Sequence, residues 1–183
     1  GTEAAHLAGI VRVTGEAQRT NDLRLIAPAM LGYALYLEQE AHLAEAEDVL
    51  ETLLRVAGTR LATPDATVAW LRLGRVLRRA TEFERATSAY AVAGRVAEAT
   101  GDRQSVLLSR IGHCNVLYFQ GNLPEAERGW RAILAEAFGA RLGDIEAHAE
   151  RGLGNVLARR GQPHLGAPHL WRAFELHEDE TSQ

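Results

Sequence analysis

The sequence predicts an all-α fold, a right-handed α-solenoid of tandem helix-turn-helix repeats, because the same kinds of side chain return every forty residues. On the first helix of each predicted repeat, small residues recur at Ala34, Gly74, Cys114 and Gly154, and leucines at Leu37, Leu77, Leu117 and Leu157. On the second helix, the recurring positions are Ala46, Ala86, Ala126 and Gly166, followed by Leu50, Tyr90, Trp130 and Leu170. Small residues let two helices approach closely and large ones fill the remaining space, so these columns indicate stacked helix pairs.

The best-defined repeat runs from Trp70 to Leu77 in the pattern W-x2-L-G-x2-L, followed by A-x3-Y-x2-A from Ala86 to Ala93. Gly74 has no side chain, so a facing helix can come close there. This pattern resembles the helix-turn-helix signature of the tetratricopeptide repeat, and the spacing is similar to that of the long-repeat (about forty-residue) type. Proteins of that type include peptide-binding bacterial regulators, the cargo-binding part of kinesin light chain and the effector-binding part of the maltose-regulon activator family.

We expect a single domain over residues 1–183, with a half repeat at 1–16 and four repeats at 21–60, 61–101, 102–142 and 143–177. Residues 1–16 have the pattern of a second helix whose first helix is missing. We therefore expect that the chain is a fragment of a longer array, with a native N-terminal capping helix as the alternative.

Local signals place the helix ends of the first two repeats. Asn21 or Asp22 can cap the first helix of repeat one, Pro28 restricts where its regular part begins, and Gly58 ends the second helix. In repeat two, Thr63-Pro64-Asp65 is a helix start.

The next boundaries carry glycine. Gly101-Asp102 and Leu142-Gly143-Asp144 each predict a helix stop followed by a cap. Gly121-Asn122 and Gly161 predict the inner turns of repeats three and four.

Composition excludes several classes of partner. The net charge is −4, and all 20 basic residues are arginine, so nothing at the level of the whole chain suggests a nucleic-acid or membrane surface. The single cysteine, Cys114, stands in the small-residue column, where a buried and unreactive thiol is expected. There is no glycosylation sequon, no membrane-length apolar run and no signal-peptide pattern, which favours a cytoplasmic protein.

No catalytic, metal or cofactor motif is convincing, so we expect no enzyme activity. Gly152-Leu153-Gly154 resembles part of a dinucleotide loop but lies in mid-helix. His164, His169 and His177 are spaced by five and eight residues, which does not suit helical metal ligands and indicates surface histidines. His113 shares a column with Leu73 and is expected to be partly buried.

Acidic residues gather on the second helices, which the resemblance places on the outer, convex layer. They are expected to form a solvated face, and they are Glu45, Glu47, Asp48, Glu51, Glu125 and Glu127.

The resemblance places the first helices along a concave groove. Repeat one presents Leu31, Leu35 and Gln39 at the groove positions. Repeats two to four present Arg72, Arg75, Arg79, Asn115, Tyr118, Phe119, His148, Arg151, Asn155 and Arg159. This set predicts a basic groove inside an acidic protein.

From this groove we expect a protein or peptide-binding scaffold whose ligand is acidic, extended and partly hydrophobic. Asn115 and Asn155 share one column, and long-repeat peptide-binding proteins are similar in carrying asparagine there. These side-chain amides could bind the ligand backbone. Two alternatives stay open: an effector-sensing fragment of a larger bacterial transcription regulator, with a small anionic effector in the groove, and a self-association module.

The last helix carries apolar residues that nothing downstream covers, namely Leu170, Trp171, Ala173 and Phe174. The sequence therefore predicts either a native continuation or self-association, for example a homodimer through the C-terminal helix.

Overall fold

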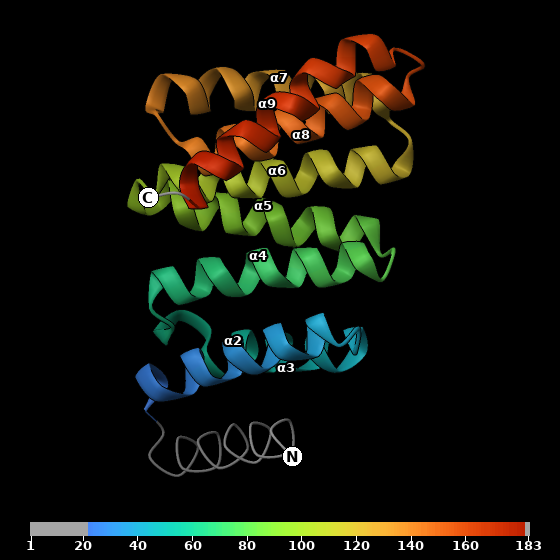
Figure 1. The fold of residues 1–183 in the computed structure, drawn as a ribbon. Helices are drawn as coiled ribbons and strands as arrows, with labels where there is room; N and C mark the ends of the chain where they lie inside the picture. Colours follow the sequence, from blue (N-terminus) through green and yellow to red (C-terminus); the bar gives the residue numbers. More distant parts are fainter. Residues whose placement is uncertain (1–21, 182–183) are drawn as a thin grey trace. The chain divides into compact units, whose positions relative to one another are not determined.

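The computed structural model describes residues 22–181, with side chains for 22–177. This part of the chain contains eight α-helices and one short 3-10 helix, and it has no strand (Figure 1). The helices are α2 (Leu23–Gln39), α3 (Leu43–Ala57), α4 (Thr63–Arg79), α5 (Phe83–Thr100), α6 (Arg103–Gln120), α7 (Leu123–Ala140), α8 (Gly143–Arg159) and α9 (Pro163–Thr181), with η1 (Gly58–Arg60) after α3. The predicted half repeat at 1–16 lies outside the described residues.

The forty-residue spacing of the sequence is also the spacing of the helices. First helices begin at residues 23, 63, 103 and 143, and second helices begin at residues 43, 83, 123 and 163. The prediction of an all-α helical repeat fold is confirmed.

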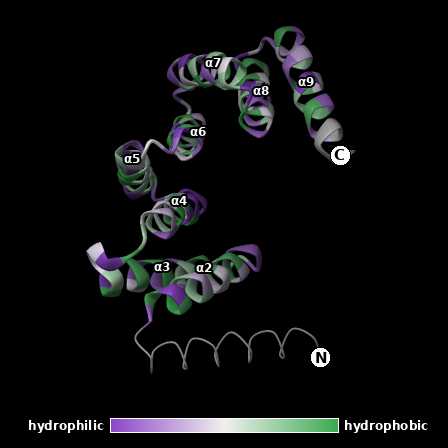
Figure 2. Cartoon of the chain, turned by 90° about the vertical axis from the view of Figure 1, so that its left-hand side faces the viewer, coloured by the Kyte–Doolittle hydropathy of each residue, from purple (hydrophilic) through white to green (hydrophobic). Residues whose placement is uncertain are grey.

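The chain divides into two compact units, an N-terminal unit (Gly1–Thr100) and a C-terminal unit (Gly101–Gln183). In the N-terminal unit α2 packs against α3 and α4, and α4 packs against α5. In the C-terminal unit α6 packs against α7 and α8, and α8 packs against α7 and α9. Each unit therefore contains two neighbouring first helices. Their helices carry hydrophilic and hydrophobic residues together, as expected for elements buried on one side (Figure 2).

The small-residue column lets the two helices of a repeat approach, as predicted. A Cβ atom on Gly74 would lie 2.8 Å from the Tyr90 ring, and one on Gly154 would lie 2.9 Å from the Gly166 carbonyl oxygen. Cys114 fills the same position in repeat three and is buried. These contacts fix how closely α5 and α9 lie to their own first helices.

Most of the predicted helix ends are confirmed. The Asp22 carboxylate accepts the Arg24 backbone N–H at 3.0 Å and caps α2, and Asp102 caps α6 through Ser105 at 3.1 Å. Gly58 ends α3, and α4 begins at Thr63.

Two predictions about helix ends were wrong. Pro28 does not mark the start of regular helix, because it lies inside α2, five residues after the helix begins. After α7 the left-handed residue is Arg141 (φ 55°), whereas Gly143 already begins α8 and Leu142 takes the cap position.

The inner turns of all four repeats use a left-handed residue at one register position. These residues are Ala41 (φ 62°), Thr81 (φ 64°), Gly121 (φ 83°) and Gly161 (φ 78°). Only the last two are glycine, so the sequence signalled the inner turn in repeats three and four but not in repeats one and two. A side chain with a positive φ is strained, and most of all a β-branched one such as threonine.

Candidate functional site

The ten predicted groove residues fall into two sets. Three of them, the arginines at 72, 75 and 79, lie on α4 in the N-terminal unit. The other seven lie on α6 and α8 in the C-terminal unit.

In the N-terminal unit, a buried carboxylate of α2 engages two of the three arginines. Arg75 donates to Glu38 Oε2 at 2.7 Å, and Arg79 donates to the Glu38 carbonyl oxygen at 2.5 Å. Glu38 is only 5% exposed. Glu38 therefore neutralises one of the three positive charges predicted for this face and holds two of the three guanidinium groups by hydrogen bonds.

Arg72 does not present its charge freely either. It is half-buried, and its Nε and Nη1 atoms are buried without a hydrogen-bond partner in the described part of the chain. Burial lowers the pKa of Arg72, and the neighbouring Arg75 lowers it further. A ligand on this face would meet guanidinium groups that are already packed or paired.

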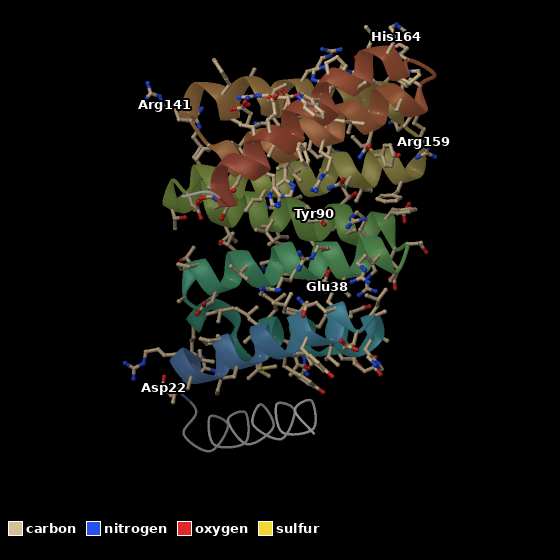
Figure 3. The ribbon with its side chains drawn as sticks, viewed as in Figure 1. Asp22, Glu38, Tyr90, Arg141, Arg159 and His164 are labelled. Atoms are coloured by element: carbon tan, nitrogen blue, oxygen red, sulfur yellow. The ribbon has the colours of Figure 1, made fainter. Side chains whose placement is uncertain are left out.

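The equivalent contact in the C-terminal unit is built differently. Arg159 donates to the Tyr118 carbonyl oxygen at 2.6 Å, as Arg79 does to the carbonyl of Glu38 eighty residues earlier. In both units the arginine reaches a carbonyl in the last turn of the preceding first helix, where the helix dipole favours a cation. Each of these carbonyls also accepts a backbone N–H, from Ala41 and from Gly121. Glu38 and Arg159 are labelled in Figure 3.

Tyr118 replaces Glu38 at this position, so an aromatic ring takes the place of a carboxylate. The Arg159 guanidinium lies 4.9 Å from the centre of the Tyr118 ring, a cation–π contact. Phe119 packs edge-on against Tyr118 at 5.4 Å and remains 51% exposed. The C-terminal unit thus offers an exposed aromatic surface.

Asn115 and Asn155 occupy one register position on α6 and α8, which pack against each other. Asn115 is half-buried and Asn155 is exposed. Neither side-chain amide makes a hydrogen bond to another described residue. Both amides can therefore donate to and accept from a ligand.

His148 and Arg151 lie nearer the start of α8 and line a pocket of about 400 Å³ between α8 and α9. Arg151 Nη2 lies 2.7 Å from His148 Nδ1. Burial lowers the pKa of His148, and the charge of Arg151 adds to this effect. A neutral imidazole that accepts from Arg151 fits both observations.

The remaining sequence candidates have structural explanations. Cys114 is buried as predicted, and burial raises the pKa of its thiol to about 11, so the thiolate that reacts is suppressed. Gly152-Leu153-Gly154 lies within α8 as expected. The described residues contain no group of three or more side chains placed to hold a metal ion.

Two histidine predictions were wrong. His113 is exposed, not partly buried. His169 is not a free surface residue, because its Nδ1 atom lies 2.5 Å from Oε2 of Glu150, which is 9% exposed.

The acidic second-helix residues are more than a solvated face. Arg85 of α5 reaches Glu47 at 2.5 Å and Glu51 at 2.7 Å on α3. Its hydrogen bond to Glu82, and next the one to Glu47, raise the pKa of Arg85. Glu127 of α7 pairs with Arg131 at 2.9 Å and also with Arg160. Arg131 lies on the same helix as Glu127, whereas Arg85 and Arg160 come from another helix and from a turn, so the pairs with these two could not be predicted from local spacing.

The predicted apolar edge is present on α9. Leu170, Trp171 and Phe174 are exposed, by 37%, 64% and 52%. Ala173 is the exception, since it is buried.

Known proteins resemble the chain in structure and not in sequence. No protein-family model matches it, and no curated protein matches it. No helix in the described residues has the length and apolar character needed to cross a membrane.

Solved structures of MamA share the fold. MamA of AMB-1 superimposes with a TM-score of 0.57 at 18% identity, over 97% of this chain and 95% of that chain. A MamA double mutant of RS-1 gives 0.57 at 15% identity over 95% and 96%. MamA of MSR-1 gives 0.53 at 18% identity over 96% and 95%. At this identity the likeness establishes the fold alone, an all-α helical repeat of the tetratricopeptide-like kind.

Proposed function

We propose that this chain is a non-enzymatic scaffold that binds an extended peptide or protein segment on the first-helix face of the C-terminal unit. The observation that carries the proposal is the pair of unengaged amides, Asn115 and Asn155, on neighbouring helices. The proposal includes the long-repeat class and a cytoplasmic location, as expected from the sequence.

An extended segment brings backbone N–H and C=O groups that need partners. A side-chain amide donates and accepts at once, so it can bind both kinds of group. Two amides on successive first helices would hold such a segment at two points along its length. The N-terminal unit has Leu35 and Arg75 in this column, and Arg75 is bound to Glu38.

The surroundings of the amides indicate the chemistry of the segment. Phe119 supplies an exposed apolar surface, and Arg159 beside Tyr118 supplies positive charge. An acidic segment with an apolar side chain matches this combination. Arg75 and Arg79 keep 45% and 36% of their side chains exposed, so they contribute weaker, secondary contacts.

The test uses fluorescently labelled synthetic peptides, one alternating glutamate with leucine or phenylalanine and one with lysine in place of glutamate. Asn115→Ala and Asn155→Ala should each weaken binding of the acidic peptide by about 1–3 kcal/mol, because a desolvated backbone group loses its partner. Binding should also weaken with added salt. Fluorescence anisotropy measures both effects.

The matched control is Gln120→Ala, which removes an exposed amide from the last residue of the same helix. It should leave the affinity unchanged. Equal losses for Gln120→Ala and Asn115→Ala, or equal binding of both peptides, would contradict the proposed site.

A further inference from the structure

The pocket between α8 and α9 has an apolar wall and a polar rim. Leu170, Ala173 and Phe174 of α9 form the wall, and the polar lining residues are Asp144, His148, Arg151 and His177. Because α9 contributes half of the lining, this pocket is distinct from the α6–α8 face that carries Asn115 and Asn155.

In the preceding repeat, the residues at the same register positions form a surface against which the next first helix packs, which we call a helix seat. Forty residues before Arg151, Leu170 and Ala173 stand Ile111, Trp130 and Ile133, which are buried in one cluster with Ile145, Ala149 and Leu153 of α8. Those residues are the seat into which α8 packs.

The N-terminal unit repeats this arrangement. The residues 120 positions before the same three are Leu31, Leu50 and Leu53, all buried where α4 packs against α2 and α3. In both cases the occupant of the seat is an amphipathic helix.

The α8–α9 seat differs from the other two in being uncovered and in carrying charge. Leu170 and Phe174 are exposed, and Arg151 stands where the other seats have Ile111 and Leu31. Among the described residues the Arg151 guanidinium hydrogen-bonds only to the ring nitrogen of His148. Asp144 lines the same pocket, but neither it nor any other described carboxylate forms an ion pair with Arg151. An arginine inside a helix seat is best satisfied by an acidic group on the helix that fills it.

We propose that the α8–α9 pocket seats an amphipathic α-helix of a partner protein, whose apolar ridge packs on Leu170 and Phe174 and whose carboxylate binds Arg151. Helix α9 of a second copy of this chain would fill the pocket poorly. Its exposed ridge carries Glu175, but that carboxylate already accepts from Trp171 at 2.8 Å and lies 3.5 Å from Arg172.

The test uses two labelled helical peptides that are stapled to hold their conformation. Both carry the same leucine ridge, and they differ only in a flanking position that is glutamate in one and lysine in the other. Anisotropy should show at least tenfold tighter binding of the glutamate peptide. Arg151→Glu should weaken that peptide at least tenfold and reverse the preference, whereas Arg128→Glu, an exposed arginine on α7, should change neither.

Phe174→Ser separates this pocket from the extended-segment site. It should abolish binding of the helical glutamate peptide and leave binding of the extended acidic peptide unchanged. Asn155→Ala should weaken binding of the extended acidic peptide and leave binding of the helical glutamate peptide unchanged. Failure of both helical peptides to bind, or a loss on Arg128→Glu equal to that on Arg151→Glu, overturns the proposal. Light scattering gives a third outcome: a dimer that Phe174→Ser converts to monomer would mean that a second copy fills the pocket, which also overturns it.

Discussion

The two units share one arginine-to-carbonyl contact, from Arg79 to Glu38 and from Arg159 to Tyr118, but surround it with different side chains. In the N-terminal unit Glu38 accepts from Arg75 and Arg79, so two of the three arginines on α4 are held within the unit. In the C-terminal unit Tyr118 and Asn155 occupy the positions of Glu38 and Arg75, and the amide is left without a partner in the described part. Repeat register decides which positions meet, and side-chain identity decides whether the face is closed or available to a ligand.

The largest expected difference between the units concerns the leucine column. Leu77 is 2% exposed, whereas Leu117, forty residues later, is only partly buried at the edge of its core. Leu77→Ala should lower the free energy of unfolding by about 2–5 kcal/mol, and Leu117→Ala by less, because a smaller cavity remains. Urea unfolding followed by circular dichroism measures both. Equal losses would mean that the column is packed alike in the two units.

Glycines at one register position should respond in opposite directions. A Cβ on Gly152 would lie 2.4 Å from the Trp130 ring, whereas one on Gly32 would meet nothing within 4 Å. Gly152→Ala should therefore destabilise by about 1–3 kcal/mol through overpacking. Gly32→Ala should stabilise by about 0.4–1 kcal/mol because alanine restricts the unfolded chain. Thermal unfolding gives the sign of each change in stability, and two changes of the same sign would contradict this explanation.

The ion-pair contrast can be tested with two conservative changes. Glu38→Gln removes the charge that Arg75 and Arg79 share, and it should cost about 1–3 kcal/mol because the carboxylate is buried while the arginines are partly exposed. Tyr118→Phe keeps the ring under Arg159 and should change stability by less than about 0.5 kcal/mol. Chemical unfolding at two salt concentrations measures them. A larger loss of stability for Tyr118→Phe than for Glu38→Gln would contradict the view that Glu38 is the more strongly engaged residue.

The inner turns give a smaller difference. Thr81 and Gly161 occupy the same register position with φ of 64° and 78°. Gly161→Thr should cost about 1–2 kcal/mol because threonine is strained in the left-handed region. Thr81→Gly should stabilise slightly, since relief of strain exceeds the added freedom of the unfolded chain. Differential scanning calorimetry checks both, and a destabilised Thr81→Gly variant would contradict the role of strain.

The smallest effect is a pH dependence confined to repeat four. His148 has a pKa lowered from 6.5 by burial and by Arg151, so the unfolded state binds its proton at higher pH than the folded state. Its contribution to stability is complete above about pH 6.5 and is lost as the pH falls below that value. His148→Val, which copies Val68 of repeat two, should reduce the drop in Tm between pH 8 and pH 5. An unchanged drop would show that His148 does not contribute.

The sequence by itself determined the helical repeat, its forty-residue register and the small-residue column. The physical reason is that close helix packing depends on residue size at fixed positions. The size is read directly from the sequence, which has small residues at Gly74, Cys114 and Gly154. Capping by Asp22 and Asp102 was predictable for a similar reason, because a cap is a contact between residues two or three positions apart.

Only the tertiary structure decided which polar residues are engaged. Glu38 joins Arg75 and Arg79 across about forty residues, and His169 finds Glu150 on another helix, so no local pattern revealed either pair. For this reason we propose the binding face on the C-terminal unit, and the structure places Arg151 in a pocket with α9. Such pairings depend on the reach and rotamers of long side chains between packed helices, which sequence periodicity does not specify.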